Sequence, residues 1–514
     1  MDTDPRDAHQ PSKGDTPHST TGSMSKRLAT GGAWVLGSRF VISGFGLAYT
    51  IILARLLVPE DFGLVAIAAT IALIAAAATE LSMSEALVQN PDPSADHYNT
   101  AFTLNVLRAL GLSLLLVALS KPIANLYEDL RLVAILWAIA GANIITGFKN
   151  PRLAMMLRNL VFWQDFVLRF GEKLFSLAAA VTVALIWQSY WALIAGMVAG
   201  QLVSVILSYV IVPFWPRINL SKWRELFSFS IWLTLRQLVN QANWNLDKLL
   251  LGYVLGTREL GFYTVGDRLA GVPTREVTAP VAQVAFPGFT KMAGDIPRLQ
   301  RGYTRAQTLL TAAALATGIG FAVAAEPFVL FFLGEQWQQV VPVIQVLAGV
   351  FALQTIGTPV QPLCMALGKT KILFIRSLIT FGIRVPLVVA GLLLGGLPGL
   401  LAARLVTGMI GLGINIWLVA KLIGLSPFQQ IWANRRSLIS TGAMAAAVWF
   451  VGAVWGDAVG MLLALKVLVM CLTMIVTFPV TLFFLWRIEG CPFGPEEDIL
   501  KGVISIRRRL RRAA

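Results

Sequence analysis

Long apolar runs alternate with short polar breaks along most of this chain, about fourteen times between Gly32 and Ile488. Each run is long enough to cross the ~30 Å hydrocarbon core of a bilayer as a helix of about 20 residues. Backbone groups find no water in that core, so such segments must be helical, and runs that are apolar on every face do not fit barrel strands. The pattern predicts an all-α polytopic membrane protein.

The spacing of the runs predicts two six-helix bundles followed by two further helices. The predicted transmembrane spans cover residues 32–57, 62–82, 101–119, 132–147, 168–187, 190–213, 225–250, 262–287, 306–325, 338–366, 372–394, 399–420, 437–455 and 460–486. Prolines at 273, 280 and 287 are expected to interrupt the eighth span. The predicted units are a disordered cytoplasmic tail (1–31), an N-terminal six-helix bundle (32–214), a C-terminal six-helix bundle (215–421), helices 13 and 14 (422–488) and a basic cytoplasmic tail (489–514).

Composition and charge agree with this organisation. Hydrophobic residues make up 56% of the chain and charged residues 13%, which leaves too little polar surface for a soluble globule of 514 residues. The first 30 residues are rich in Asp, Ser, Thr, Pro and Gly and cannot bury a core. They do not form a cleavable signal peptide, because the first apolar run is too long and begins too far into the chain.

The placement of Lys and Arg predicts which side of the membrane each loop faces, since short loops rich in these residues stay in the cytoplasm. With both termini cytoplasmic, the outer loops contain only Lys121, Arg131 and Arg258. The inner segments contain Lys26, Arg27, Lys149, Arg152, Arg158, Arg217, Lys222, Arg224, Lys291, Arg298, Arg301, Lys369, Lys371, Arg435, Arg436 and the basic tail. The net charge of +15 therefore follows the topology of a bacterial inner-membrane protein and does not indicate nucleic-acid binding.

A short internal repeat appears at an offset of 198 residues. Residues 57–63 (LVPEDFG) align with residues 255–261 (LGTRELG), and each segment joins one long apolar span to the next. The first copy joins predicted spans one and two, and the second joins spans seven and eight. This placement predicts two halves related as parallel repeats, an arrangement found in many secondary transporters.

Ionisable residues inside predicted spans are costly, so each is a candidate functional residue. Arginines outnumber acids there: Arg39, Arg108, Arg236, Arg268, Arg275, Arg376, Arg384 and Arg404 against Asp247, Asp267 and Glu276. In span seven, polar residues recur at helical spacing and share one face. The functional interpretation is a hydrated cavity whose arginines hold an anionic head group, because guanidinium groups match phosphate. The predicted substrate-binding residues are Arg39, Arg236, Asn240, Asn243, Asp247, Arg268 and Arg275.

Structural explanations stand beside this interpretation. Some arginines reach the membrane interface or bond between helices, and this reading is favoured for five charged residues near span ends. These are Arg169, Glu172, Lys173, Arg305 and Lys421. For Asp247, a local ion pair with Lys248 and a role in ion coupling both remain open. Neutralising Asp247 is expected to abolish a drug antiporter and to disturb a flippase little.

Nothing in the sequence predicts catalysis, a cofactor or a metal site. The three histidines are His9, His18 and His97, so the membrane region lacks the usual general base. The carboxylate runs 60–61 and 496–498 read as solvated, and the three cysteines have no metal-site or disulfide spacing. A nucleotide-binding loop of the GxxxxGK type is also missing from the sequence.

Several short segments resemble the polysaccharide transporter family. They are the PEDFG stretch at 59–63 and residues 87–89, 100–105, 150–152, 160–164 and 259–263. The resemblance implies membership of the multidrug, oligosaccharidyl-lipid and polysaccharide exporter superfamily. It further implies two bundles around a V-shaped cavity that turns a polyprenyl-pyrophosphate-linked oligosaccharide over in the membrane. Membrane lipid and a polysaccharide polymerase or glycosyltransferases are the partners it implies.

The leading hypothesis is therefore a flippase, not an enzyme, that moves a lipid-linked oligosaccharide for exopolysaccharide or lipopolysaccharide synthesis by alternating access. A multidrug cation antiporter of the same superfamily is the nearest alternative, although cationic drugs favour an acidic cavity. A membrane glycan polymerase or ligase is a third reading, which the short predicted outer loops disfavour.

Overall fold

The computed structural model describes residues 20–80, 83, 87, 92–158, 162–224, 231–456, 458–491, 494 and 496–497. Every regular element in these ranges is a helix. Ten of the described helices are long and apolar enough to cross a membrane. The all-α polytopic fold is confirmed, whereas the total of fourteen spans and the boundaries of the predicted units remain predictions.

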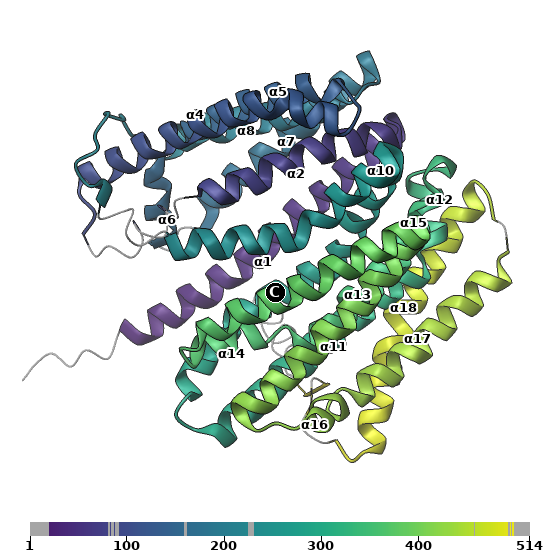
Figure 1. The fold of residues 1–514 in the computed structure, drawn as a ribbon. Helices are drawn as coiled ribbons and strands as arrows, with labels where there is room; N and C mark the ends of the chain where they lie inside the picture. The colour runs from purple at the N-terminus through teal and green to yellow at the C-terminus, as the bar shows by residue number, and fades with distance from the viewer. Residues whose placement is uncertain are drawn as a thin grey trace, which may run out of the picture.

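Two groups of helices lie side by side in Figure 1. The first bundle contains α1 (Thr20–Leu56), α2 (Pro59–Thr79), α4 (Ala95–Leu126), α5 (Arg131–Gly147), the short α6 (Ala154–Arg158), α7 (Phe162–Trp187) and α8 (Trp191–Ile211). The second bundle contains α11 (Ile296–Val323), α12 (Ala325–Phe332), α13 (Val340–Gln354), α14 (Val360–Ala366), α15 (Thr370–Ile423), α16 (Pro427–Trp432), α17 (Arg435–Val454) and α18 (Met461–Ile488). Short 3-10 turns at Pro151–Leu153, Glu335–Trp337 and Thr355–Gly357 complete the described elements.

Helix α10 (Ile231–Met292) connects the two bundles and is broken at Gly256, whose φ of 85° and ψ of −177° favour glycine. Before the break, Gly252 packs on Ile67 of α2, and the Tyr127 hydroxyl at the end of α4 donates to the Leu249 carbonyl. After the break, Gly266 packs on Val343 of α13. The first arm of α10 therefore contacts the first bundle, and the second arm packs within the second bundle.

Helix α15 is broken in a similar way at Gly395 and Gly396. The two arms of α15 pack closely on either side of this turn. Gly391 on the first arm and Gly399 on the second each face the backbone carbonyl of the other, and neither position has room for a Cβ. Both breaks fall between spans that the hydrophobic pattern separates, at 250–262 and at 394–399. Local sequence thus located these turns correctly.

Three expectations differ from the structure. Helix α1 begins at Thr20, so helix extends into the segment predicted as a tail, and α10 stays helical through the prolines at 273, 280 and 287. Two of the carboxylates expected to be solvated, Asp61 and Glu496, are buried. Asp61 accepts backbone hydrogen bonds from Tyr190 and Val58, while Glu496 pairs with Arg436 at 3.1 Å. Burial raises the pKa of Glu496, although the Arg436 charge opposes that rise.

Candidate functional site

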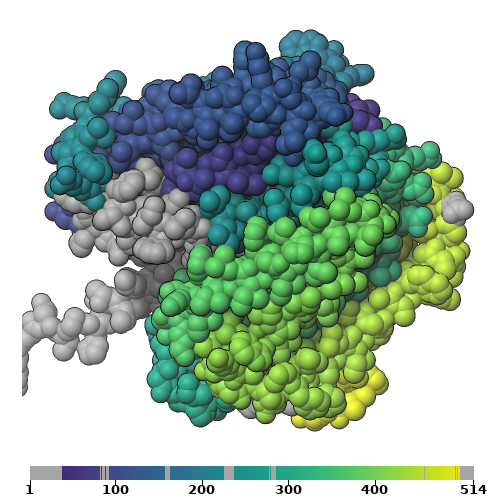
Figure 2. All heavy atoms as spheres, in the orientation of Figure 1, coloured from purple at the N-terminus to yellow at the C-terminus, as the bar shows by residue number. Residues whose placement is uncertain are grey.

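The two bundles meet at one end of the molecule and separate toward the other. Helices α6 and α14 lie toward the separated end, as does the first part of α1 (Figure 1). Helix α12 lies toward the joined end. The space-filling view shows a hollow between the bundles at the separated end (Figure 2). We call this hollow the cleft and the joined end the sealed end.

Glycines of the internal repeat make the closest contact at the sealed end. A Cβ on Gly63 would overlap the carbonyl oxygen of Thr257, and a Cβ on Gly261 would overlap that of Pro59. The offset of 198 maps Gly63 onto Gly261 and Pro59 onto Thr257, so the two contacts are equivalent. The reciprocal geometry is that of two repeats facing each other across a pseudo-twofold axis.

Polar contacts reinforce the sealed end. Glu60 pairs with Arg258 at 3.3 Å, and these residues are also equivalent in the repeat. The Trp337 indole donates to the Ala54 carbonyl at 2.7 Å, and the Arg55 guanidinium donates to the Phe332 carbonyl at 2.8 Å. These bonds join the end of α1 to the last residue of α12 and to the 3-10 turn that follows it. Carbonyls left free at the ends of both helices thereby gain donors across the bundle interface.

Two arginines on the second arm of α10, Arg268 and Arg275, are exposed. Arg268 and Arg275 lie seven residues apart, or about 10 Å along one helical face. The Arg268 guanidinium lies 5.6 Å from the ring centre of Tyr49 on α1, and Arg275 lies 5.8 Å from that of Phe351 on α13. A contact with an aromatic ring uses the flat face of a guanidinium group, so the N–H groups at its edge can still donate to an anion.

Arg39, a third predicted arginine, is paired with an acid across the bundles. Its Nε donates to Glu276 Oε2 at 3.2 Å, and the side chains are 37% and 19% exposed. The partners are 237 residues apart in the chain. The structure therefore gives Arg39 an ion pair between helices, and its role in substrate binding stays a prediction.

Asp247 is paired with arginines of α15 rather than with Lys248, the partner that the sequence suggested. Its carboxylate accepts hydrogen bonds from Arg384 at 2.6 Å and Tyr263 at 2.9 Å, and it lies 3.2 Å from Arg404. The side chain is only 4% exposed. Lys248, its expected partner, pairs instead with Asp267 at 3.2 Å. Asp247 is thus a buried counter-charge that joins both arms of α10 to both arms of α15.

The remaining predicted residues follow the first arm of α10. Asn240 is exposed and Asn243 is half-buried, with a buried Oδ1 that makes no hydrogen bond within the described structure. The backbone of Arg236 lies in α10, and its side chain lies outside the described residues. The polar face predicted for this span therefore passes from exposed residues to buried Asp247.

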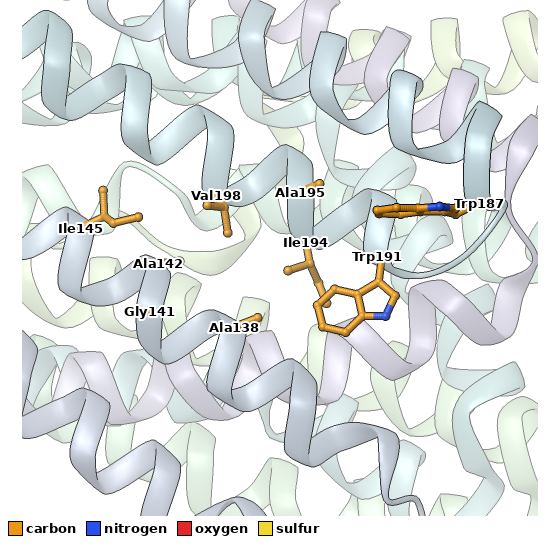
Figure 3. Close-up of a pocket in the computed structure, with 9 residues that line it drawn as sticks. All are labelled: Ala138, Gly141, Ala142, Ile145, Trp187, Trp191, Ile194, Ala195 and Val198. Atoms are coloured by element: carbon orange, nitrogen blue, oxygen red, sulfur yellow. The ribbon is translucent and has the colours of Figure 1, made fainter.

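One further pocket is entirely apolar. It has a volume of about 420 Å³ and lies between α5 and α8, beside the end of α7 (Figure 3). Its lining consists of Ala138, Gly141, Ala142, Ile145, Trp187, Trp191, Ile194, Ala195 and Val198. Without a charged lining residue, this pocket has no means to hold an anionic head group.

Sequence reasoning missed several residues of the charged site. Tyr49, Phe351 and Tyr263 were not singled out, since an aromatic residue in an apolar span carries no special signal. Glu276 was counted among the membrane acids, but nothing in a single sequence pairs it with Arg39.

Comparison with solved structures shows which known fold this chain shares. The lipid II flippase MurJ in an inward closed conformation matches with a TM-score of 0.73 at 15% identity, covering 88% of this chain and 99% of that one. An inward-facing multidrug resistance MATE family transporter matches with a TM-score of 0.58 at 13% identity, covering 75% and 98%. The chain has the two-bundle fold of these membrane transporters.

The chain belongs to the polysaccharide biosynthesis protein family, whose model matches residues 52–342. The lipopolysaccharide biosynthesis protein WzxC of Escherichia coli is 23% identical over 79% of this chain and 84% of its own length. The succinoglycan biosynthesis transport protein ExoT of Rhizobium meliloti is 25% identical over 79% and 83%. The predicted family is confirmed, as is a transporter rather than an enzyme.

Proposed function

We propose that this protein is a flippase that moves a polyprenyl-diphosphate-linked oligosaccharide across the inner membrane by alternating access. The observation that carries the proposal is the pair of exposed arginines, Arg268 and Arg275, on a helix that borders the cleft. A diphosphate offers several anionic oxygens to two guanidinium groups, which bind such groups through forked hydrogen bonds. Relatives named for lipopolysaccharide and succinoglycan biosynthesis support an oligosaccharide cargo.

Orientation follows from the charged loops. The basic segments predicted to be cytoplasmic include α6 and the start of α15, and α6 and α14 lie at the separated end. With both termini cytoplasmic, the cleft opens toward the cytoplasm, where a lipid-linked precursor is loaded. The glycan and diphosphate then occupy the cleft while the lipid chain stays in the bilayer, and a polymerase or glycosyltransferase handles the cargo on either side.

A multidrug antiporter would need acidic groups for its cations. In the described part of the chain, Asp247, Asp267 and Glu276 are each paired with Arg or Lys. Exposed arginines would repel a cationic drug at the same place. The charge of the cleft therefore favours an anionic cargo.

Replacing both Arg268 and Arg275 with glutamine should abolish export while leaving the fold intact. Each lost charge-assisted contact is expected to weaken diphosphate binding about tenfold or more. In a host whose copy of the gene is deleted, we expect surface polysaccharide to disappear and the lipid-linked repeat unit to accumulate. Both are measured after complementation with the wild-type or variant gene.

Arg131→Gln is the matched control, because Arg131 pairs with Asp129 in the α4–α5 loop outside the cleft. This variant should restore the polymer as well as wild type does. Normal polymer in the double variant would contradict the proposed anion site. Normal polymer in the deletion strain, together with greater sensitivity to cationic dyes, would instead identify a drug antiporter.

A further inference from the structure

We propose that Glu276 is an internal substitute for the substrate's phosphate: its carboxylate pairs with Arg39, and the diphosphate displaces it on binding. This inference rests on the proposed function and concerns how the site is controlled. It assigns Glu276 a role as an internal competitor for an arginine of the site.

The geometry of the ion pair is suited to exchange. A single hydrogen bond joins Arg39 Nε to one Glu276 oxygen, so the forked face of the guanidinium is not engaged by this carboxylate. The arginine side chain is 37% exposed, which gives an incoming anion access to it. Ion pairs that stay in contact with water are weak, because solvent screens both charges.

The buried Asp247 cluster shows what a permanent pair looks like in the same protein. Asp247 takes bonds from Arg384 through both oxygens and a further bond from the Tyr263 hydroxyl. Its side chain is 4% exposed, against 19% for Glu276. Of these two inter-helix carboxylates, only Glu276 can therefore be released without leaving a fully buried charge unpaired.

A diphosphate has an advantage over Glu276 at this position. It carries more charge than one carboxylate and can engage the forked face of the Arg39 guanidinium through two oxygens at once. Displacement also removes an ion pair between α1 in the first bundle and the second arm of α10. Binding of the substrate thereby weakens a contact that holds the bundles in the arrangement described above, so binding favours their movement.

The test measures binding of farnesyl diphosphate to purified full-length protein in nanodiscs by calorimetry. Removal of the competitor in Glu276→Gln should tighten binding by up to about fivefold, the range expected for a partly exposed ion pair. The gain should vanish in the Arg39→Gln background. Glu172→Gln is the matched control, since it removes an equal charge beside Lys173 rather than beside Arg39.

The outcomes separate the two proposals. Tighter binding in Glu276→Gln alone supports displacement, provided that its thermal unfolding matches wild type. Unchanged or weaker binding in Glu276→Gln, or an equal gain in Glu172→Gln, would overturn the displacement but leave the anion site in place. No binding by the wild-type protein would overturn both the displacement and the proposed function.

Discussion

Replacing Asp247 with alanine should destabilise the protein by about 3 to 5 kcal/mol, the cost of removing one partner from a buried ion pair. Arg384 and Arg404 have side chains that are 12% and 6% exposed, and both rely on this carboxylate. Their Nε atoms already lack a hydrogen-bond partner in the described structure. Losing Asp247 would leave two buried cations without the acid that neutralises them.

Thermal unfolding in detergent, followed with a thiol-reactive dye, would measure this loss of stability. Cys364 is fully buried, so its labelling reports loss of the second bundle's core. A background with Cys471→Ser and Cys491→Ser removes the half-buried and the exposed thiol. Asp129→Ala is the control, because its partner Arg131 is 52% exposed and the pair should contribute less than about 1 kcal/mol. Unfolding of Asp247→Ala at the wild-type temperature would show that the cluster does not depend on this charge.

Because Asp247 is buried beside Arg384 and Arg404, neutralising it cannot distinguish an antiporter from a flippase. Neutralising Asp247 was expected to separate an antiporter from a flippase, but its contacts with three other helix arms make it a structural residue in either case. A loss of activity in an Asp247 variant would then report damaged packing rather than ion coupling. Substitutions at Arg268 and Arg275 avoid this difficulty, because both side chains are exposed.

Placing a side chain on Gly63 or Gly261 should open the sealed end. Even alanine would overlap a backbone carbonyl of the opposite repeat, and a backbone cannot rotate aside as a flexible side chain can. Overpacking of this kind costs about 1 to 3 kcal/mol or more, all of it in the sealed arrangement. Gly63→Ala should therefore lower the sealed population about fivefold or more relative to an arrangement in which the helices separate.

Chemical cross-linking would measure the sealed population. Cysteines at Glu60 and Arg258, whose side chains pair at 3.3 Å, would be joined by a short bis-maleimide in a protein otherwise free of cysteine. Gly63→Ala and Gly261→Ala should each reduce the yield. Gly442→Ala in α17 should not, because its added Cβ would meet no atom within 4 Å. Equal yields in all three variants would contradict a steric role for the repeat glycines.

The repeat shows how far sequence reasoning reached. Comparing residues 57–63 with 255–261 identified Gly63 and Gly261 as equivalent, because a duplicated segment keeps its local pattern. It did not predict that each glycine contacts the other copy, since equivalence in a repeat carries no information about distance. Similarly, the helical spacing of Asn240, Asn243 and Asp247 predicted a shared face but not how burial changes along it.

The sequence by itself determined the helical fold, the breaks in α10 and α15, and the excess of arginine over acid in the membrane. These features depend on local hydrophobicity and on charge, which neighbouring residues specify without reference to the rest of the chain. Only the tertiary structure decided which charges are paired, and it left Arg268 and Arg275 exposed while pairing Arg39 with Glu276. Such pairings join residues far apart in the chain, so they depend on how the helices pack and not on any local pattern.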